Sequence, residues 1–297
     1  MSHTRWVSSW AAVLIVALAT RVIAAPVSGT TPANAVTTGD ISSQAAAVLD
    51  EYESARQSFV DEYQKATTDA EREKIAKAKM PDRGIYAHRA FDLARSRPAD
   101  PGSVDAAAVA LQLAASQDFK LKSETLDVLE TRHLNDPRLP ETFQWLLDWP
   151  SKKTEAFLQD VSQKSTSRNV RGQALLALAG YFRQKSRWGE RFKQDPDMRK
   201  DIEKEHNRDV IDALPENIEK PLAQAKALYQ KVIDEYGDVK GPNGSIAELA
   251  RNILYAFDHL TVGNKAPEIE GPTIDGKTMK LREYQGKVVV LDFWGDW

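Results

Sequence analysis

The sequence predicts a mainly α-helical protein that ends in a short β segment. Over residues 41–260, apolar side chains recur at steps of three and four residues, which is the spacing of one face of a helix. Breaks rich in proline and glycine divide this region into separate helices, most clearly at 97–102. Beyond Gly263 the pattern changes, and the apolar run 288–293 predicts a strand buried in a sheet.

Composition limits the function classes that the chain can belong to. The 297 residues are enough for two ordinary domains, and 42% hydrophobic with 28% charged residues is typical of a soluble globular protein. The formal net charge of −3 argues against a nucleic-acid partner. The sequence contains no Gly-rich phosphate loop, no Gly-x-Ser-x-Gly and no His-Glu-x-x-His, so no cofactor, nucleotide or hydrolase site is predicted.

Cysteine is absent from the sequence. An exported chain could use disulfides for stability, and this one has none. These residues also lack any thiolate for disulfide exchange or peroxide reduction.

Residues 1–24 have the pattern of a secretory signal peptide. Arg5 precedes the apolar run 11–19, and small residues precede a cleavage site after Ala24. The apolar run is shorter than the ~20 residues of a spanning helix, and Arg21 interrupts it. We expect cleavage, export to the periplasm or cell envelope, and a mature chain two charges more negative. Membrane attachment is expected only if the segment stays uncleaved.

Residues 25–40 predict a flexible linker because they are rich in Pro, Thr, Ser and Gly. A helical domain is expected over 41–260. Its expected helices cover about 41–63, 69–78, 83–95, 104–116, 120–134, 141–147, 154–163, 170–184, 221–236 and 245–260. The first helix is expected to bury Ile41, Ala45, Val48, Tyr52, Ala55, Phe59 and Tyr63. The charge-dense stretch 187–220 is expected to be a solvated helix and loops.

Short helices joined by tight loops predict helical hairpins stacked as in a repeat array, although no fixed period is present. The stretch 223–237, with Pro221 in the first turn, resembles a tetratricopeptide-type helix. Such a surface could bind a peptide or protein partner. In the last helix, Ser245 and Glu248 predict a capping box. Its expected buried stripe is Ile246, Leu249, Ile253, Leu254, Phe257 and Leu260.

From about Val262 onward the chain resembles a redoxin domain. Residues 263–267 match a Gly-x-x-Ala-Pro opening, 274–277 a first hairpin turn, and 281–287 the Leu-x-x-x-x-Gly-Lys before a central strand. Residues 293–297 are similar to the Phe-Trp-x-x-Trp that precedes Cys-x-x-Cys in TlpA/ResA-like thiol-disulfide oxidoreductases. The chain is identified as a member of this thioredoxin-like redoxin family, of the AhpC/TSA superfamily.

The resemblance implies that 261–297 is the N-terminal part of an incomplete thioredoxin-like α/β domain, truncated just before its Cys-x-x-Cys. It implies an oxidoreductase acting on protein disulfides or a redox partner, and an inactive chain in this cysteine-free form. Two alternatives stay open: a helical-repeat binding module with a vestigial redoxin segment, and a peroxiredoxin-type antioxidant in the intact form. The Phe-Trp-x-x-Trp pattern favours disulfide exchange. The coding sequence beyond Trp297 would distinguish these hypotheses. A Cys-x-x-Cys there indicates a fragment of an oxidoreductase, and a stop codon indicates the binding module.

The resemblance also implies roles for three residues. Asp292 would accept the proton of the second thiol in an intact domain. Trp294 and Trp297 would flank the redox motif, although both could equally be ordinary packing aromatics. A short redoxin piece rarely builds its own core, so we expect 262–297 to pack on the helical domain or to be poorly ordered.

No metal site is predicted, although two sequence spacings resemble those of di-iron helical bundles. Glu130-x-x-His133 and Glu203-x-x-His206 have the Glu-x-x-His spacing of such sites. However, His133 is expected at a helix end and His206 in the charged stretch, which does not give a closed ligand set.

Overall fold

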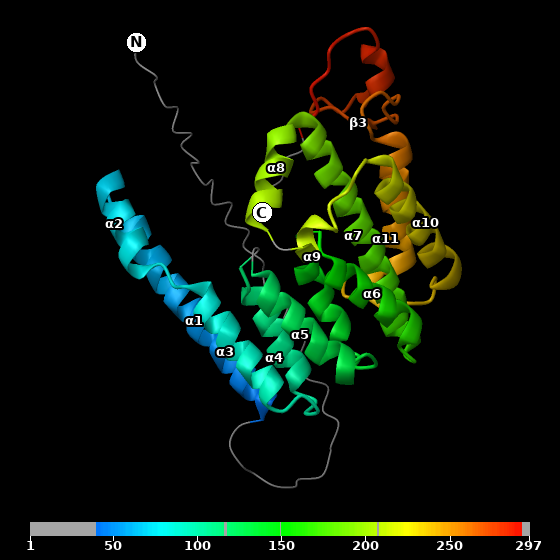
Figure 1. Cartoon of the computed structure of the whole chain (residues 1–297). Coiled ribbons are helices and arrows are strands. Elements are labelled where there is room, and N and C mark those ends of the chain that lie inside the picture. The colour runs from blue at the N-terminus through cyan, green and yellow to red at the C-terminus, as the bar shows by residue number, and fades with distance from the viewer. Residues whose placement is uncertain (1–39, 116–117, 149, 207, 293–297) are drawn as a thin grey trace. The chain divides into compact units, whose positions relative to one another are not determined.

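The computed structural model describes residues 40–115, 118–148, 150–206 and 208–292 (Figure 1). The chain divides into two units, residues 1–37 and 38–297, and all described residues belong to the second. These residues form eleven α-helices, two 3-10 helices and two short antiparallel β-hairpins, so the predicted mainly α-helical class is confirmed. Among the helices described, none has the length and apolar content needed to cross a membrane.

The helices are α1 (Ile41–Lys65), α2 (Asp69–Lys79), α3 (Arg83–Ser96), α4 (Ser103–Leu113), α5 (Phe119–Arg132), α6 (Lys152–Lys164), α7 (Arg168–Gln194), α8 (Pro196–Glu205), α9 (Arg208–Ile211), α10 (Glu219–Glu235) and α11 (Ile246–His259). The 3-10 helices are η1 (Leu139–Leu146) and η2 (Leu281–Tyr284). The strands are β1 (Lys240–Gly241), β2 (Gly244–Ser245), β3 (Glu270–Pro272) and β4 (Thr278–Lys280).

Local side-chain caps determine where several helices begin. The carboxylate of Asp40 accepts a hydrogen bond of 2.7 Å from the Ser43 backbone N–H at the start of α1. Thr68 and Glu71 form a complete capping box on α2. At α11, Ser245 accepts from the Glu248 backbone N–H at 3.3 Å, and the reciprocal bond of the predicted box is absent from the described hydrogen bonds.

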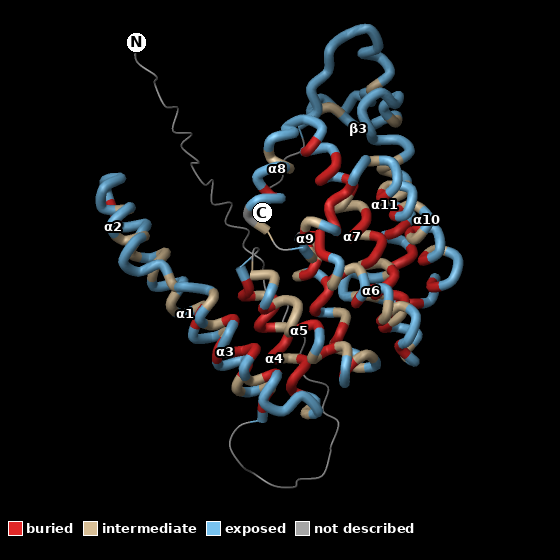
Figure 2. Tube along the Cα trace, in the orientation of Figure 1, coloured by how far each residue is buried: buried red, intermediate tan, exposed pale blue. Residues whose placement is uncertain are grey.

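Helix α7 is the centre of the main core. It packs against α6, α10, α11 and η1, and much of its length is buried (Figure 2). Its Tyr181 is almost completely buried. Tyr229 of α10 and Phe157 of α6 are buried to the same degree. Consecutive helices pack on one another in the pairs α3 with α4, α6 with α7 and α10 with α11.

The stretch 187–220 has a small core of its own, so the prediction of solvated helix and loops was wrong for part of it. α7 continues ten residues past the predicted end at Gln184, to Gln194. Its extension and the two helices that follow bury Trp188, Phe192, Ile202, Val210 and Leu214 together. These apolar side chains come from three helices and the turn after α9, and they are few among many charged residues. The composition of the stretch therefore indicated a solvated segment.

The expected apolar stripes of α1 and α11 are only partly covered. On α1, Ile41 to Tyr52 are buried as expected, but Tyr63 is 37% exposed. On α11, Leu249 is 44% and Leu260 is 60% exposed, against expectation. α11 is the last α-helix of the described residues, and no α-helix follows it there to cover these side chains. The segment expected as an ordinary helix over 141–147 is instead the 3-10 helix η1.

The C-terminal segment contains the predicted hairpin but not the predicted strand. β3 pairs with β4 with Gly271 opposite Met279, and the turn between them includes Gly276 at φ 74°, a conformation that glycine adopts without strain. Residues 288–292 form no strand, because no neighbouring strand lies beside them in the described part of the chain. Val288 and Val290 are 98% and 87% exposed, so this part is not packed on the helices.

Candidate functional site

The expected redox site is represented by one described residue. Asp292 lies at the end of the apolar run after η2, and its side chain is exposed. The two aromatic residues expected to flank the redox motif, Trp294 and Trp297, lie outside the described residues. The sequence has no cysteine. Of the expected redox site, the described residues therefore include only the candidate proton acceptor, Asp292.

The histidines of the two Glu-x-x-His spacings have structural contacts. His133 is buried, and its Nε2 lies 2.8 Å from the carbonyl oxygen of Pro98. The Nδ1 of His206 lies 3.1 Å from the carbonyl oxygen of Ile202, one turn earlier. Glu130 accepts a hydrogen bond from the Lys153 amine at 2.7 Å.

Glu203 likewise has a partner, because it accepts from Arg199 at 2.9 Å. The described residues contain no group of three or more His, Asp or Glu side chains placed to hold a metal ion.

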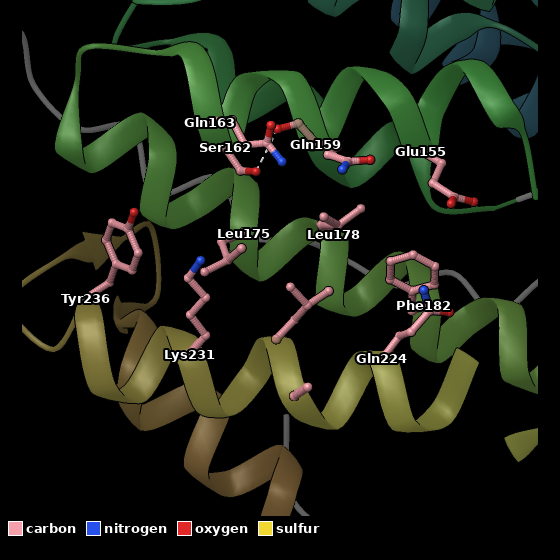
Figure 3. Close-up of a pocket in the computed structure, with 12 residues that line it drawn as sticks. Glu155, Gln159, Ser162, Gln163, Leu175, Leu178, Phe182, Gln224, Lys231 and Tyr236 are labelled. Atoms are coloured by element: carbon pink, nitrogen blue, oxygen red, sulfur yellow. Dashed lines mark hydrogen bonds between the residues drawn. The ribbon is translucent and has the colours of Figure 1, made fainter. Parts of the chain in front are cut away.

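The helical domain has an open groove between α6 and α10. Both helices pack on α7, which forms the floor (Figure 3). The groove has a volume of about 380 Å³. We call it the α6–α10 groove and define it by Gln159, Gln163, Leu178, Gln224, Leu228 and Lys231.

The floor of the groove is apolar and its walls are polar. Leu175, Leu178 and Phe182 point from α7 toward the groove, and each is 6% exposed. Helix geometry produces this arrangement, because residues three or four apart lie on one face. Gln159 and Gln163 are one turn apart on α6 and therefore stand on the same wall.

The side-chain amides of the walls have free hydrogen-bonding capacity. Gln159 and Gln163 on α6 and Gln224 on α10 make no side-chain hydrogen bond to the described residues, and all three are exposed. The dashed line in Figure 3 is a different bond, from the Ser162 hydroxyl to the backbone carbonyl of Gln159 at 2.7 Å. Each free amide offers a donor and an acceptor to a ligand.

The charged groups of the groove are compensated within the protein. Glu155 accepts a hydrogen bond from Lys185 at 3.0 Å, and both side chains are largely shielded, with exposed fractions of 22% and 12%. Lys231 lies 4.0 Å from Glu235 of the next helical turn. The charge of Glu155 is therefore compensated within the protein, and Lys231 stands beside an acidic residue at the exposed rim.

A second hollow continues the groove along α10. It has a volume of about 210 Å³ and shares Glu155, Phe182 and Gln224 with the first. It extends to Pro215 and Lys220, before and at the start of α10. α10 has 17 residues. At ~1.5 Å per helical residue and ~3.3 Å per extended residue, a helix of that length spans about eight residues of an extended peptide.

A buried polar network holds the beginning of the α6 wall in place. The Tyr181 hydroxyl on α7 donates to the Ser151 carbonyl at 2.9 Å and accepts from the Ser151 N–H at 3.1 Å. The Ser151 hydroxyl donates to Asp209 at 2.6 Å, and the Lys153 N–H donates to the same carboxylate at 2.8 Å. Burial raises the pKa of Tyr181, so its hydroxyl stays protonated and keeps both bonds.

Sequence reasoning identified none of these groove or network residues as functional. Gln159, Gln163 and Gln224 carry no motif, and only their position on two separate helices brings them to one groove. A polar pair at a four-residue spacing, as in α6, was the one local signal, and it is common on solvated helices.

A third hollow, of about 570 Å³, lies within the C-terminal segment. Pro267, Tyr284, Val289 and Leu291 line it, so its lining is partly apolar. Its lining residues come from the stretch 265–268, from η2 and from the apolar run.

Comparison of the chain with models of protein families, with curated proteins and with solved structures gives no match. Fold and groove therefore describe a helical protein with an open, neutral groove and a C-terminal β-hairpin.

Proposed function

We propose that the chain belongs to an exported thioredoxin-like thiol-disulfide oxidoreductase of the TlpA/ResA type. In this proposal residues 41–260 bind a protein partner, and residues 261–297 begin the redoxin domain. The observation that carries it is the β3–β4 hairpin followed by η2 and the exposed apolar run 288–291. The redoxin resemblance leads us to expect a hairpin and then a central strand, and the run 288–291 has the place of that strand in the sequence.

The exposed apolar run supports the proposal. A strand of this composition is normally covered by neighbouring strands of a sheet, and the described part of the chain contains no such neighbours. Val288 and Val290 are 98% and 87% exposed. A large apolar side chain that stays in water forgoes about 1.5–3 kcal/mol of burial free energy. An unpaired apolar segment also invites aggregation at its edge. The hollow lined by Tyr284, Val289 and Leu291 is where further elements of a domain could pack.

The proposed chemistry is thiol-disulfide exchange. A first cysteine thiolate attacks a substrate disulfide, which gives a mixed disulfide and releases one substrate thiolate. The second thiol loses its proton to a carboxylate, for which Asp292 is the candidate, and attacks the mixed disulfide. The substrate leaves as a dithiol and the enzyme disulfide forms. Both cysteines lie outside the 297 residues of this sequence, since it contains none.

The coding sequence after the Trp297 codon is the direct test. A Cys-x-x-Cys encoded there supports the oxidoreductase, and a stop codon contradicts it. The 297-residue chain should reduce insulin disulfides no faster than buffer, because it has no thiol. If a longer product consumes peroxide faster than it reduces insulin, the peroxiredoxin-type alternative replaces this proposal.

A protein-binding module without redox chemistry is the second candidate. The α6–α10 groove favours it, because the groove is open, has an apolar floor and has free amides on both walls. Partner binding that is unchanged when all disulfides are removed from the partner, combined with a stop codon after Trp297, would favour this candidate.

A further inference from the structure

We propose that the α6–α10 groove binds an extended, uncharged stretch of polypeptide through its backbone. In the proposed function this ligand is an unfolded segment of the protein substrate, so the inference rests on that function for its role. The binding itself requires no thiol. Three observations support it: the free amides, the charge balance and the apolar floor.

The amides match the chemistry of a peptide backbone. An extended chain presents N–H donors and C=O acceptors in alternation. Gln159 and Gln163 on one wall and Gln224 on the other each carry both a donor and an acceptor, without a competing bond to the described residues. These amides would form hydrogen bonds with the peptide backbone, which is the same in every sequence. Many different side-chain sequences could therefore bind.

The charge balance selects an uncharged segment. Glu155 is neutralised by Lys185 at 3.0 Å, and Lys231 has Glu235 at 4.0 Å. Within the α6–α10 groove a charged peptide side chain would lose hydration beside charges that already have a partner. Exposed charged side chains, such as Lys152, Glu216 and Lys220, line the neighbouring hollow and not this groove. The formal net charge of −3 for the whole chain adds no attraction for an acidic segment.

The floor has room for the apolar side chains of such a segment. Leu175, Leu178 and Phe182 of α7 and Leu228 of α10 line the groove between the amides. Successive side chains of an extended peptide point to opposite sides, so alternate ones would face this floor. The uncharged stretch is confined to the α6–α10 groove, because the hollow that continues it along α10 is lined by several charged side chains.

Fluorescence anisotropy of the 297-residue chain tests the proposal. The probe is a fluorescein-labelled octapeptide of alternating serine, valine, threonine and leucine. We expect saturable binding of this peptide. A peptide of the same sequence with alternate backbone nitrogens methylated lacks half of its N–H donors, and we expect its affinity to fall at least tenfold. Peptides with lysine or with glutamate in place of serine and threonine should also bind at least tenfold more weakly.

Two kinds of variant locate the binding. Gln163→Ala with Gln224→Ala removes one amide from each wall, and we expect a loss of about 5- to 100-fold in affinity for two hydrogen bonds. Ala227→Trp fills the groove from an exposed position of α10 and should abolish binding. Gln230→Trp is the matched control, because Gln230 is exposed on the same helix and does not line the groove. It should bind like the unmodified chain.

Several results would overturn the inference. They are an absence of saturable binding by the neutral peptide, equal affinity for its N-methylated form, tighter binding of a charged peptide, and unchanged binding by Ala227→Trp. None of these results depends on a cysteine in the protein or the peptide. Failure here therefore leaves the proposed redox function standing, and failure of the redox test leaves the groove intact as a peptide site.

Discussion

The hydroxyl of Tyr181 forms two hydrogen bonds with one residue, donating to the carbonyl of Ser151 at 2.9 Å and accepting from its N–H at 3.1 Å. Ser151 is the N-cap of α6, and its own hydroxyl is held by Asp209 at 2.6 Å. One side chain of α7 thus fixes the start of the helix that forms a wall of the groove.

Tyr181→Phe should destabilise the protein by about 1–3 kcal/mol, because it leaves the buried Ser151 N–H without a partner, while the Ser151 carbonyl keeps its bond from the Glu155 N–H at 3.1 Å. Urea unfolding followed by circular dichroism measures the change. Tyr63→Phe is the control, since Tyr63 is 37% exposed and its hydroxyl has no hydrogen bond among the described residues. Equal stability of the two variants would contradict the role of the Tyr181 hydroxyl.

Arg138 joins three parts of the chain. It donates to Asp105 of α4 at 2.6 Å, to Asp136 at 2.8 Å and to the carbonyl of Pro101 at 2.6 Å. Arg138→Met keeps the length of the side chain but removes these bonds, and should cost about 1–2 kcal/mol after allowance for partial exposure. Arg89→Met, which removes an exposed ion pair, should cost about 0–1 kcal/mol. Urea midpoints of the two variants provide the comparison.

The same contact predicts a pH dependence. Hydrogen bonds from Arg138 hold the pKa of Asp136 below its ordinary value of 3.8. The folded state therefore binds this proton less readily than the unfolded state, so the contact stabilises the fold above pH ~4 and the contribution is lost as the pH falls through the folded pKa. Urea unfolding should be measured between pH 6 and pH 2. We expect the free energy of unfolding to fall less over this range in Arg138→Met than in the unmodified chain. Parallel curves would refute this assignment.

The second core predicts a large effect inside a charge-rich stretch. Phe192→Ala removes a side chain that is 8% exposed and packs near Trp188, with ring centroids 5.9 Å apart. A loss of about 3–5 kcal/mol is expected from the cavity and the lost burial. Lys193→Ala, one residue along and exposed, should change stability by less than about 0.5 kcal/mol. Similar thermal midpoints for both would mean that 187–220 is solvated after all.

The exposed apolar run predicts a change in solubility without a change in stability. Val290 is 87% exposed, so Val290→Lys should leave the urea midpoint of the helical domain unchanged and reduce aggregation in light scattering. Val232 is fully buried in α10, and Val232→Lys should unfold the domain because its charge would lose hydration. A lowered urea midpoint in Val290→Lys would mean that this run is packed in solution.

Helix positions could be predicted from the sequence where they depend on nearby residues. Thr68 with Glu71 starts α2, and Asp275 with Gly276 lies in the turn of the β3–β4 hairpin, because such caps and turns are made within four residues. The end of α7 was missed because Trp188 and Phe192 bury against α8 and α9, and no local signal reports that contact.

The sequence by itself determined the helical class, most helix starts and the hairpin turn, because spacing and capping act over a few residues. Only the tertiary structure decided which faces are covered. Leu249 is apolar and lies in the expected stripe, but it is 44% exposed. Its burial depends on whether another element packs on it, and helical spacing does not contain that information. The groove amides and the bond of Tyr181 to Ser151 likewise join residues far apart in sequence, and the packing of α6 and α10 on α7 brings them together.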